Sequence, residues 1–179
     1  MGENPSESTT FVEKKGDALA LFFDSPGNAI FMHGANCRKT MGAGIALQVR
    51  NKVAPLFFLD QYDTRHDNQR FGSYAAVVLA QSDKGVKLGV NLYTQLDPGP
   101  NFDLYALINS LRAFTSSFEP EKRKEFTVFL PQIGCGIGGS QWDIVKPAIM
   151  KELASFNVVA VEYEKPTENV EFDNEGVSK

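Results

Sequence analysis

The sequence predicts a single α/β domain in which helices cover a mostly parallel sheet. Strand-like apolar segments alternate along the chain with helix-like segments, and this alternation is typical of a layered α/β fold. Residues 77–79 and 158–161 are near-continuous apolar runs, as expected for strands that are covered on both faces. The chain has 179 residues, which is enough for one substantial core but hardly for two.

The strands are expected at residues 10–14, 29–33, 74–80, 86–93, 126–131 and 157–163. The helices are expected at residues 43–52, 55–63, 102–118 and 141–155. Apolar residues recur every three or four positions in the third helix, and Asn101 precedes it as a cap. Ser140 precedes the fourth helix in the same way, and acidic Asp143 lies in its first turn, where a negative charge is stabilising.

The folded domain is expected to span residues 10–164. Residues 1–9 and 165–179 are polar, and the second segment is also acidic, so both are predicted to be disordered tails. No apolar run approaches transmembrane length and no signal peptide is visible, so we expect no membrane partner. Cys37 and Cys135 lack paired spacing, which argues against a disulfide framework or a zinc site and favours a cytoplasmic or other reduced compartment.

The charge balance limits the classes of partner. The chain has 18 Lys and Arg residues against 22 Asp and Glu residues, which gives a formal charge of −4. A broad nucleic-acid interface needs a basic face, so we expect no direct binding of nucleic acid. A small anionic ligand is still compatible with this charge, because glycine-rich loops bind anions through backbone dipoles.

Two glycine-rich loops are the most informative feature of the sequence. One runs from Met41 to Ile45 and the other from Ile133 to Gly139. Each follows a predicted buried strand and leads into a predicted helix, so bare backbone N–H groups are expected at a helix N-terminus, where phosphate binds readily. Neither loop has the P-loop or the dinucleotide-fingerprint spacing. Because ligands of α/β folds bind at the carboxyl ends of strands, we predict that the two loops hold one diphosphate from both sides.

The stretch from His33 to Ala46 contains an Ala-Asn pair, a short spacer and a glycine run that ends in an aliphatic residue. It resembles the first ligand loop of the macrodomains, which bind ADP-ribose. The stretch from Leu130 to Trp142 resembles their second ligand loop, and Gly16-Asp17 resembles their early Gly-Asp pair. The order and spacing agree along nearly the whole domain. The resemblance implies a three-layer αβα fold with a mixed, mostly parallel six-stranded sheet.

The resemblance also implies a role for each part of the site, with no metal or cofactor. Asp17 would accept a hydrogen bond from the adenine amino group, Asn36 would bond the distal ribose, and Tyr163 would lie near the adenine. The loops would hold the diphosphate through Gly42, Ala43, Gly44, Ile45, Gly134, Cys135, Gly136, Ile137, Gly138 and Gly139. Without the resemblance, Asp17 and Asn36 are simply turn or cap residues, and Cys135 is a small buried side chain.

His33 distinguishes the macrodomain branches. Many macrodomains carry Asn at this position, whereas the small ADP-ribose 1''-phosphate phosphatases carry His in a stretch that closely resembles residues 33–46. The resemblance implies that His33 lies at the mouth of the distal-ribose pocket, where it would attack phosphorus or transfer a proton. Taken alone, a His at a strand end is more often structural, and the sequence names no partner that would orient this one.

We therefore predict an enzyme that binds ADP-ribose or ADP-ribose 1''-phosphate as its small-molecule partner and converts the second to ADP-ribose and phosphate. The alternatives are a non-catalytic ADP-ribose reader and a hydrolase that removes ADP-ribose from a modified macromolecule. Two departures count against the known hydrolase mechanisms of the family. Residues 91–95 contain no Lys, and Gly138 and Ala46 stand where particular branches have Asp.

Overall fold

The structure, a computed structural model, describes residues 8–165, so the predicted tails lie almost wholly outside the described residues. The strands are β1 (Phe11–Gly16), β2 (Ala29–Asn36), β3 (Tyr74–Ser82), β4 (Gly85–Gln95), β5 (Thr127–Pro131) and β6 (Asn157–Tyr163). The helices are α1 (Ala18–Asp24), α2 (Gly44–Lys52), α3 (Ala54–Gln61), α4 (Asp67–Arg70), α5 (Leu104–Ser116), α6 (Pro120–Arg123) and α7 (Trp142–Glu152).

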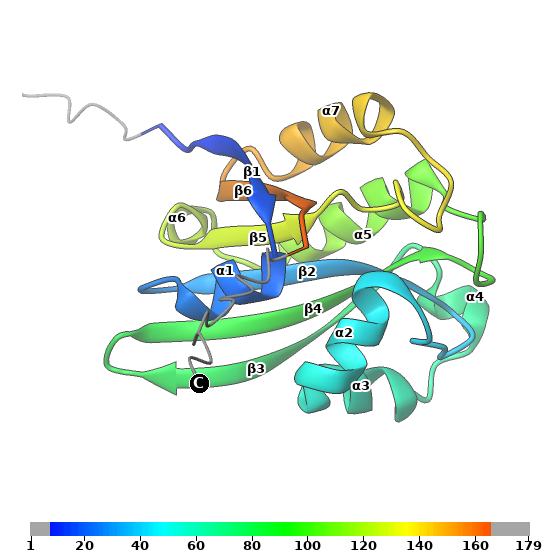
Figure 1. The fold of residues 1–179 in the computed structure, drawn as a ribbon. Coiled ribbons are helices and arrows are strands. Elements are labelled where there is room, and N and C mark those ends of the chain that lie inside the picture. Colours follow the sequence, from blue (N-terminus) through cyan, green and yellow to red (C-terminus); the bar gives the residue numbers. More distant parts are fainter. Residues whose placement is uncertain (1–7, 166–179) are drawn as a thin grey trace, which may run out of the picture.

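These strands form a six-stranded sheet in the order β1-β6-β5-β2-β4-β3 (Figure 1). Neighbouring strands are parallel except β3 and β4, which pair antiparallel. The predicted mixed, mostly parallel six-stranded sheet is therefore confirmed. The parallel strands end along one edge of the sheet, where Asn36 at the end of β2 pairs with Gln95 at the end of β4.

Two apolar cores lie on opposite faces of the sheet, and β2 contributes to both. Its residues Ile30 and Met32 belong to the core that α5 and α7 cover, whereas Phe31 belongs to the core under α1, α2 and α3. Each of these three side chains is fully buried, which stabilises the fold by about 1.5–3 kcal/mol per side chain. Figure 1 shows the resulting three layers, with the sheet between the two groups of helices.

The helices differ from the sequence prediction in number. The sequence pattern does not predict α1, α4 or α6. The last two have four residues each, and the seven residues of α1 are too few for a helical period to stand out. Helix α1 is nevertheless well capped, because Asp17 Oδ1 accepts a hydrogen bond from the Ala20 N–H at 3.1 Å. In residues 8–165, no helix is long and apolar enough to cross a membrane.

The predicted helix caps are wrong by one or two residues. The N-cap of α5 is Asp103 rather than Asn101, and its Oδ1 accepts from the Ala106 N–H at 2.8 Å. The N-cap of α7 is Gln141 rather than Ser140, and it makes no capping bond through its side chain. Both helices begin one or two residues later than the sequence predicts, at Leu104 and Trp142.

Candidate ligand-binding site

A pocket of about 550 Å³ lies at the carboxyl ends of the parallel strands. We call residues 37–43, between β2 and α2, the first loop, and residues 132–141, between β5 and α7, the second loop. Both loops line the pocket, together with the ends of β2, β4 and β6. The predicted ligand residues found in the lining are Asn36, Gly42, Ala43, Gly44, Ile45, Gly134, Cys135, Gly136, Ile137, Gly138 and Tyr163. The structure therefore brings the two glycine-rich stretches to one pocket.

Three glycines of the second loop are required by the fold itself. A Cβ atom added to Gly134 would collide with the Phe102 ring, and one added to Gly138 would lie 2.7 Å from the Gly134 carbonyl oxygen. Gly134 and Gly139 also have φ angles of 77° and 81°, in the left-handed region that favours glycine. The Phe102 N–H donates to the Gly138 carbonyl at 3.3 Å. Phe102 thus supports the second loop from behind.

Gly42 and Gly136 are different. Neither has a positive φ, and a Cβ atom added to either would meet no atom within 4 Å. Both lie in the pocket lining, one on each loop. Neither crowding nor backbone strain therefore explains glycine at these two positions. A ligand placed directly against the backbone would explain it, because a side chain would hold that ligand away.

Asn36 closes the first loop. Its Oδ1 accepts from the Arg38 N–H at 2.9 Å, and its Nδ2 donates to Thr40 Oγ1 and to the Thr40 carbonyl at 2.8 and 2.9 Å. This is the turn role that the residue type alone suggests. The bond from Asn36 to a distal ribose stays a prediction.

His33 is not part of the pocket lining, although the next residue, Gly34, is. Its side chain is fully buried, and its ring stacks on Phe31 with 5.9 Å between the ring centroids. His33 Nε2 lies 2.6 Å from Asn91 Oδ1, and Asn91 Nδ2 donates to the Leu56 carbonyl at 3.1 Å. The expected place at the mouth of the pocket is therefore wrong, because the odd-numbered side chains of β2 point beneath the helix layer of α1–α3. The partner that the sequence could not name is Asn91.

The hydrogen bonds of Asn91 determine the protonation of His33. Because the Asn91 amide donates to Leu56, its oxygen must accept from His33, so Nε2 carries the proton and Nδ1 is an acceptor. Within residues 8–165, Nδ1 has no hydrogen-bond partner. Burial lowers the pKa of His33 to about 4, and the hydrogen bond to Asn91 opposes this shift only in part. The imidazole is consequently neutral near pH 7.

Two other predicted residues also lie outside the lining, namely Asp17 and Gly139. Asp17 is the N-cap of α1, and its second carboxylate oxygen lies 3.8 Å from the Lys52 Nζ. It directly follows Gly16, which pairs with Tyr163 of the lining. Asp17 is therefore beside the pocket, and its contact with adenine stays a prediction.

Two pocket residues at the end of β4 carry no signal in the sequence that marks them as ligand-binding. Thr94 is 1% exposed and lines the pocket, and its Oγ1 would lie only 2.9 Å from a Cβ atom added to Gly34. Gln95 also lines the pocket, and its amide donates to the carbonyls of Asp97 and Gly99. The parallel arrangement could have found both, since the ends of neighbouring parallel strands meet at the same edge.

The pocket is nearly free of charged side chains. Among its lining residues only Glu162 is charged. In the part of the chain that the structure describes, no group of three His, Cys, Asp or Glu side chains could hold a metal ion. Apart from the Glu162 carboxylate and the Cys135 thiol, the polar groups available to a ligand are thus backbone groups, hydroxyls and amide side chains.

Comparison with known proteins agrees with this architecture, although no family model matches the chain. The sequence is 34% identical over 152 residues to an uncharacterized 17.5 kDa protein from the tk-vs intergenic region of Enterobacteria phage T4, covering 84% of this chain and 94% of that protein. The macrodomain of Mycobacterium tuberculosis DarG is similar in structure, with a TM-score of 0.65, 20% identity and coverage of 86% of this chain and 98% of that one.

Thermosipho africanus DarTG in complex with ADP-ribose is also similar, with a TM-score of 0.63 and 20% identity. That match covers 80% of this chain and 39% of the DarTG chain. The sequence relative establishes the protein family, and the two structures establish the fold. The chain therefore belongs to the family of the phage T4 17.5 kDa protein and has the macrodomain fold.

Proposed function

We propose that this protein binds ADP-ribose, with the diphosphate held between the first and second loops. The observation that carries the proposal is the pair Gly42 and Gly136, which have no structural need to be glycine and face the pocket from opposite loops. The similarity to DarTG, which is described in complex with ADP-ribose, supports the same ligand.

The backbone of α2 would supply much of the affinity. The helix begins at Gly44, with Ala43 as a cap that makes no side-chain bond, so its first N–H groups are available to an anion. A diphosphate there would also interact favourably with the positive end of the helix dipole. Asp17 would select an amino-bearing purine from its place beside Tyr163, and Asn36 would meet the distal ribose.

The test is calorimetric titration with ADP-ribose of the wild type and of Gly42→Ala and Gly136→Ala. We expect each variant to unfold at the wild-type temperature and to bind at least ten times more weakly, because the added methyl group displaces the diphosphate. Gly134→Ala is the matched contrast and should lower the melting temperature, since its Cβ would collide with Phe102. Wild-type affinity in both Gly42→Ala and Gly136→Ala would refute the proposed site.

Hydrolysis of ADP-ribose 1''-phosphate is a second candidate, supported by the resemblance of residues 33–46 to the phosphatase branch. The geometry does not favour direct attack by His33, because its ring is buried and Nε2 is bonded to Asn91. His33 would instead act indirectly, through the shape of the pocket wall at Gly34. A free-phosphate assay on the wild type and His33→Gln tests this candidate. No release by the folded wild type would leave a reader or a hydrolase of attached ADP-ribose.

A further inference from the structure

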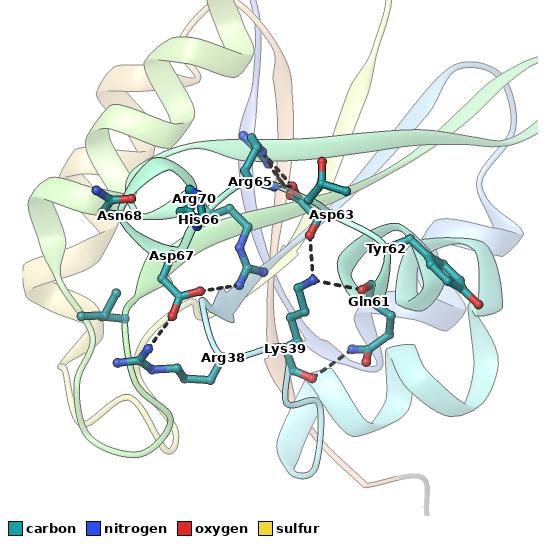
Figure 2. Close-up of a pocket in the computed structure, with 12 residues that line it drawn as sticks. Arg38, Lys39, Gln61, Tyr62, Asp63, Arg65, His66, Asp67, Asn68 and Arg70 are labelled. Atoms are coloured by element: carbon teal, nitrogen blue, oxygen red, sulfur yellow. Dashed lines mark hydrogen bonds and ion pairs between the residues drawn. The ribbon is translucent and has the colours of Figure 1, made fainter.

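A second hollow lies on the other side of the first loop and is lined mainly by residues of the first loop, the end of α3, α4 and the segment between these helices (Figure 2). Half of the lining residues are charged. At its inner end is Arg70, which is 1% exposed. The Arg70 guanidinium donates to the Cys37 carbonyl of the first loop, to Asp67 at 3.0 Å and to the buried Asp60 at 3.4 Å. It also lies over the Tyr93 ring, 5.3 Å from its centroid.

The next two residues of the first loop are bound to the same hollow. Arg38 pairs with Asp67 of α4 and, at 2.7 Å, with Asp97 in the segment after β4 that also lines the ligand pocket. Lys39 Nζ donates to the carbonyls of Gln61 and Asp63 at 3.0 and 2.7 Å (Figure 2). Residues 37, 38 and 39 are thus each held from the side opposite to the pocket.

Lys39 shows that this attachment has a cost. Among the described residues it is the one non-glycine residue with a positive φ, 59°. A long side chain in that region strains the backbone. The bond from its Nζ to the carbonyl of Gln61, the last residue of α3, and the bond from Gln61 Nε2 to the Lys39 carbonyl at 2.9 Å hold it there. The strained turn directs Thr40 back toward the ligand pocket.

The hollow does not fit an anion site of its own, because Arg38, Arg65 and Arg70 are all paired with Asp carboxylates. Stability alone does not explain it either. A buried ion pair such as Arg70–Asp60 often stabilises a fold no more than apolar residues of the same volume would. What the pair does provide is a fixed direction for the bond to the Cys37 carbonyl.

We propose that Arg70 is a positioning residue and that, with Lys39, it clamps the first loop in the conformation that binds the ligand. The proposal rests on the proposed function for its affinity readout. The fork of Arg70 reaches Cys37, Asp60 and Asp67 together, which a single ammonium group cannot do. Loss of the clamp leaves the sheet and both cores intact and lets residues 37–43 move.

The test uses Arg70→Lys, Lys39→Asn and a matched control, Arg65→Lys. Asn tolerates the left-handed conformation at position 39 and removes only the Nζ bonds. Arg65 belongs to the same hollow and lies 5.8 Å from the Tyr93 ring centroid, but its bonds go to Asp63, Ser73 and Tyr74 rather than to the first loop. ADP-ribose affinity is measured well below every melting temperature, and amide hydrogen exchange is followed over residues 40–47 and in α5.

We expect Arg70→Lys and Lys39→Asn to weaken ADP-ribose binding at least fivefold and to speed amide exchange in residues 40–47 at least tenfold. Exchange in α5 should not change in these variants, and Arg65→Lys should keep the wild-type affinity and exchange. A merely destabilising substitution would instead lower the melting temperature without changing affinity in the folded state. Wild-type affinity and exchange in a folded Arg70→Lys would overturn the proposal. If Arg70→Lys does not fold, the same two measurements on Lys39→Asn test the proposal, and wild-type values for both would overturn it.

The outcome is separable from that of the proposed function. If the wild type does not bind ADP-ribose, the ligand assignment is wrong. Amide hydrogen exchange alone then tests whether Arg70 and Lys39 hold the first loop in place. Unchanged exchange in residues 40–47 of both variants would overturn it.

Discussion

The protonation of His33 is the most direct test of where the structure places this residue. The side chain is 0% exposed, and its Nε2 bonds to Asn91. Burial lowers its pKa from the ordinary value of 6.5 to about 4. The perturbation we propose is a pH titration of stability in the wild type and in His33→Gln, which cannot titrate at this position.

The direction of the effect follows from proton binding. Between pH 4 and pH 6.5 the unfolded chain binds a proton at His33 that the folded protein does not bind. His33 therefore contributes fully to stability above pH 6.5, and its contribution decreases as the pH falls through this range. At 1.36 kcal/mol per pH unit the loss amounts to about 3 kcal/mol, a large part of a typical unfolding free energy of roughly 5–15 kcal/mol.

The assay is urea unfolding at several pH values from 7.5 to 4.0, with the free energy of unfolding extrapolated to water. Carboxylates titrate in both proteins, so the difference in pH dependence between them isolates His33. We expect the wild type to lose about 3 kcal/mol more than His33→Gln over this range. Equal pH dependence in the two proteins would refute the buried placement, and would reopen a role for a charged His33 at the pocket mouth.

Two further predictions concern single contacts. Thr94→Val keeps the shape of the side chain but removes a hydroxyl group from the pocket. We expect an unchanged fold and an ADP-ribose affinity reduced by about three- to tenfold, as for one lost hydrogen bond. An unchanged dissociation constant in calorimetry would mean that the hydroxyl does not contact the ligand. Asp103→Ala removes the N-cap of α5 and should cost about 1 kcal/mol, or roughly 2–4 °C in melting temperature by scanning calorimetry; a wild-type melting temperature would contradict the capping role.

The sheet could be predicted from the sequence because each strand carries its own signal. β2 and β5 are apolar runs, each followed within a few residues by a glycine-rich loop, and both the strands and the loops lie where those signals place them. The two glycine loops could be placed at one edge for the same reason, since parallel strands end together. Asp103 was harder to identify, because several polar residues precede α5 and only the geometry shows which one bonds the helix.

His33 and Arg70 show what the sequence could not provide. The motif around His33 fixes its position in the chain, but the face of β2 on which it lies depends on the packing of Leu56 and Asn91 from elsewhere. Arg70 occupies a four-residue helix with no motif at all. Its contacts reach from Asp67, three positions away, to Cys37, 33 positions away. No local sequence pattern indicates the second contact.

The two sides of the first loop differ in the charge of the side chains around them. The ligand pocket has one charged lining residue, Glu162, whereas the reverse side carries Arg38, Lys39 and Arg70. Arg38 and Arg70 are paired with Asp67, Asp97 and Asp60, so much of their field is cancelled before it reaches the pocket. A diphosphate bound by a protein of charge −4 would then depend on backbone amides, whose direction is fixed by the loop conformation. This is why a clamp on the reverse side matters for affinity: amide dipoles attract an anion only when they point at it, whereas a lysine in the pocket would attract it from many directions.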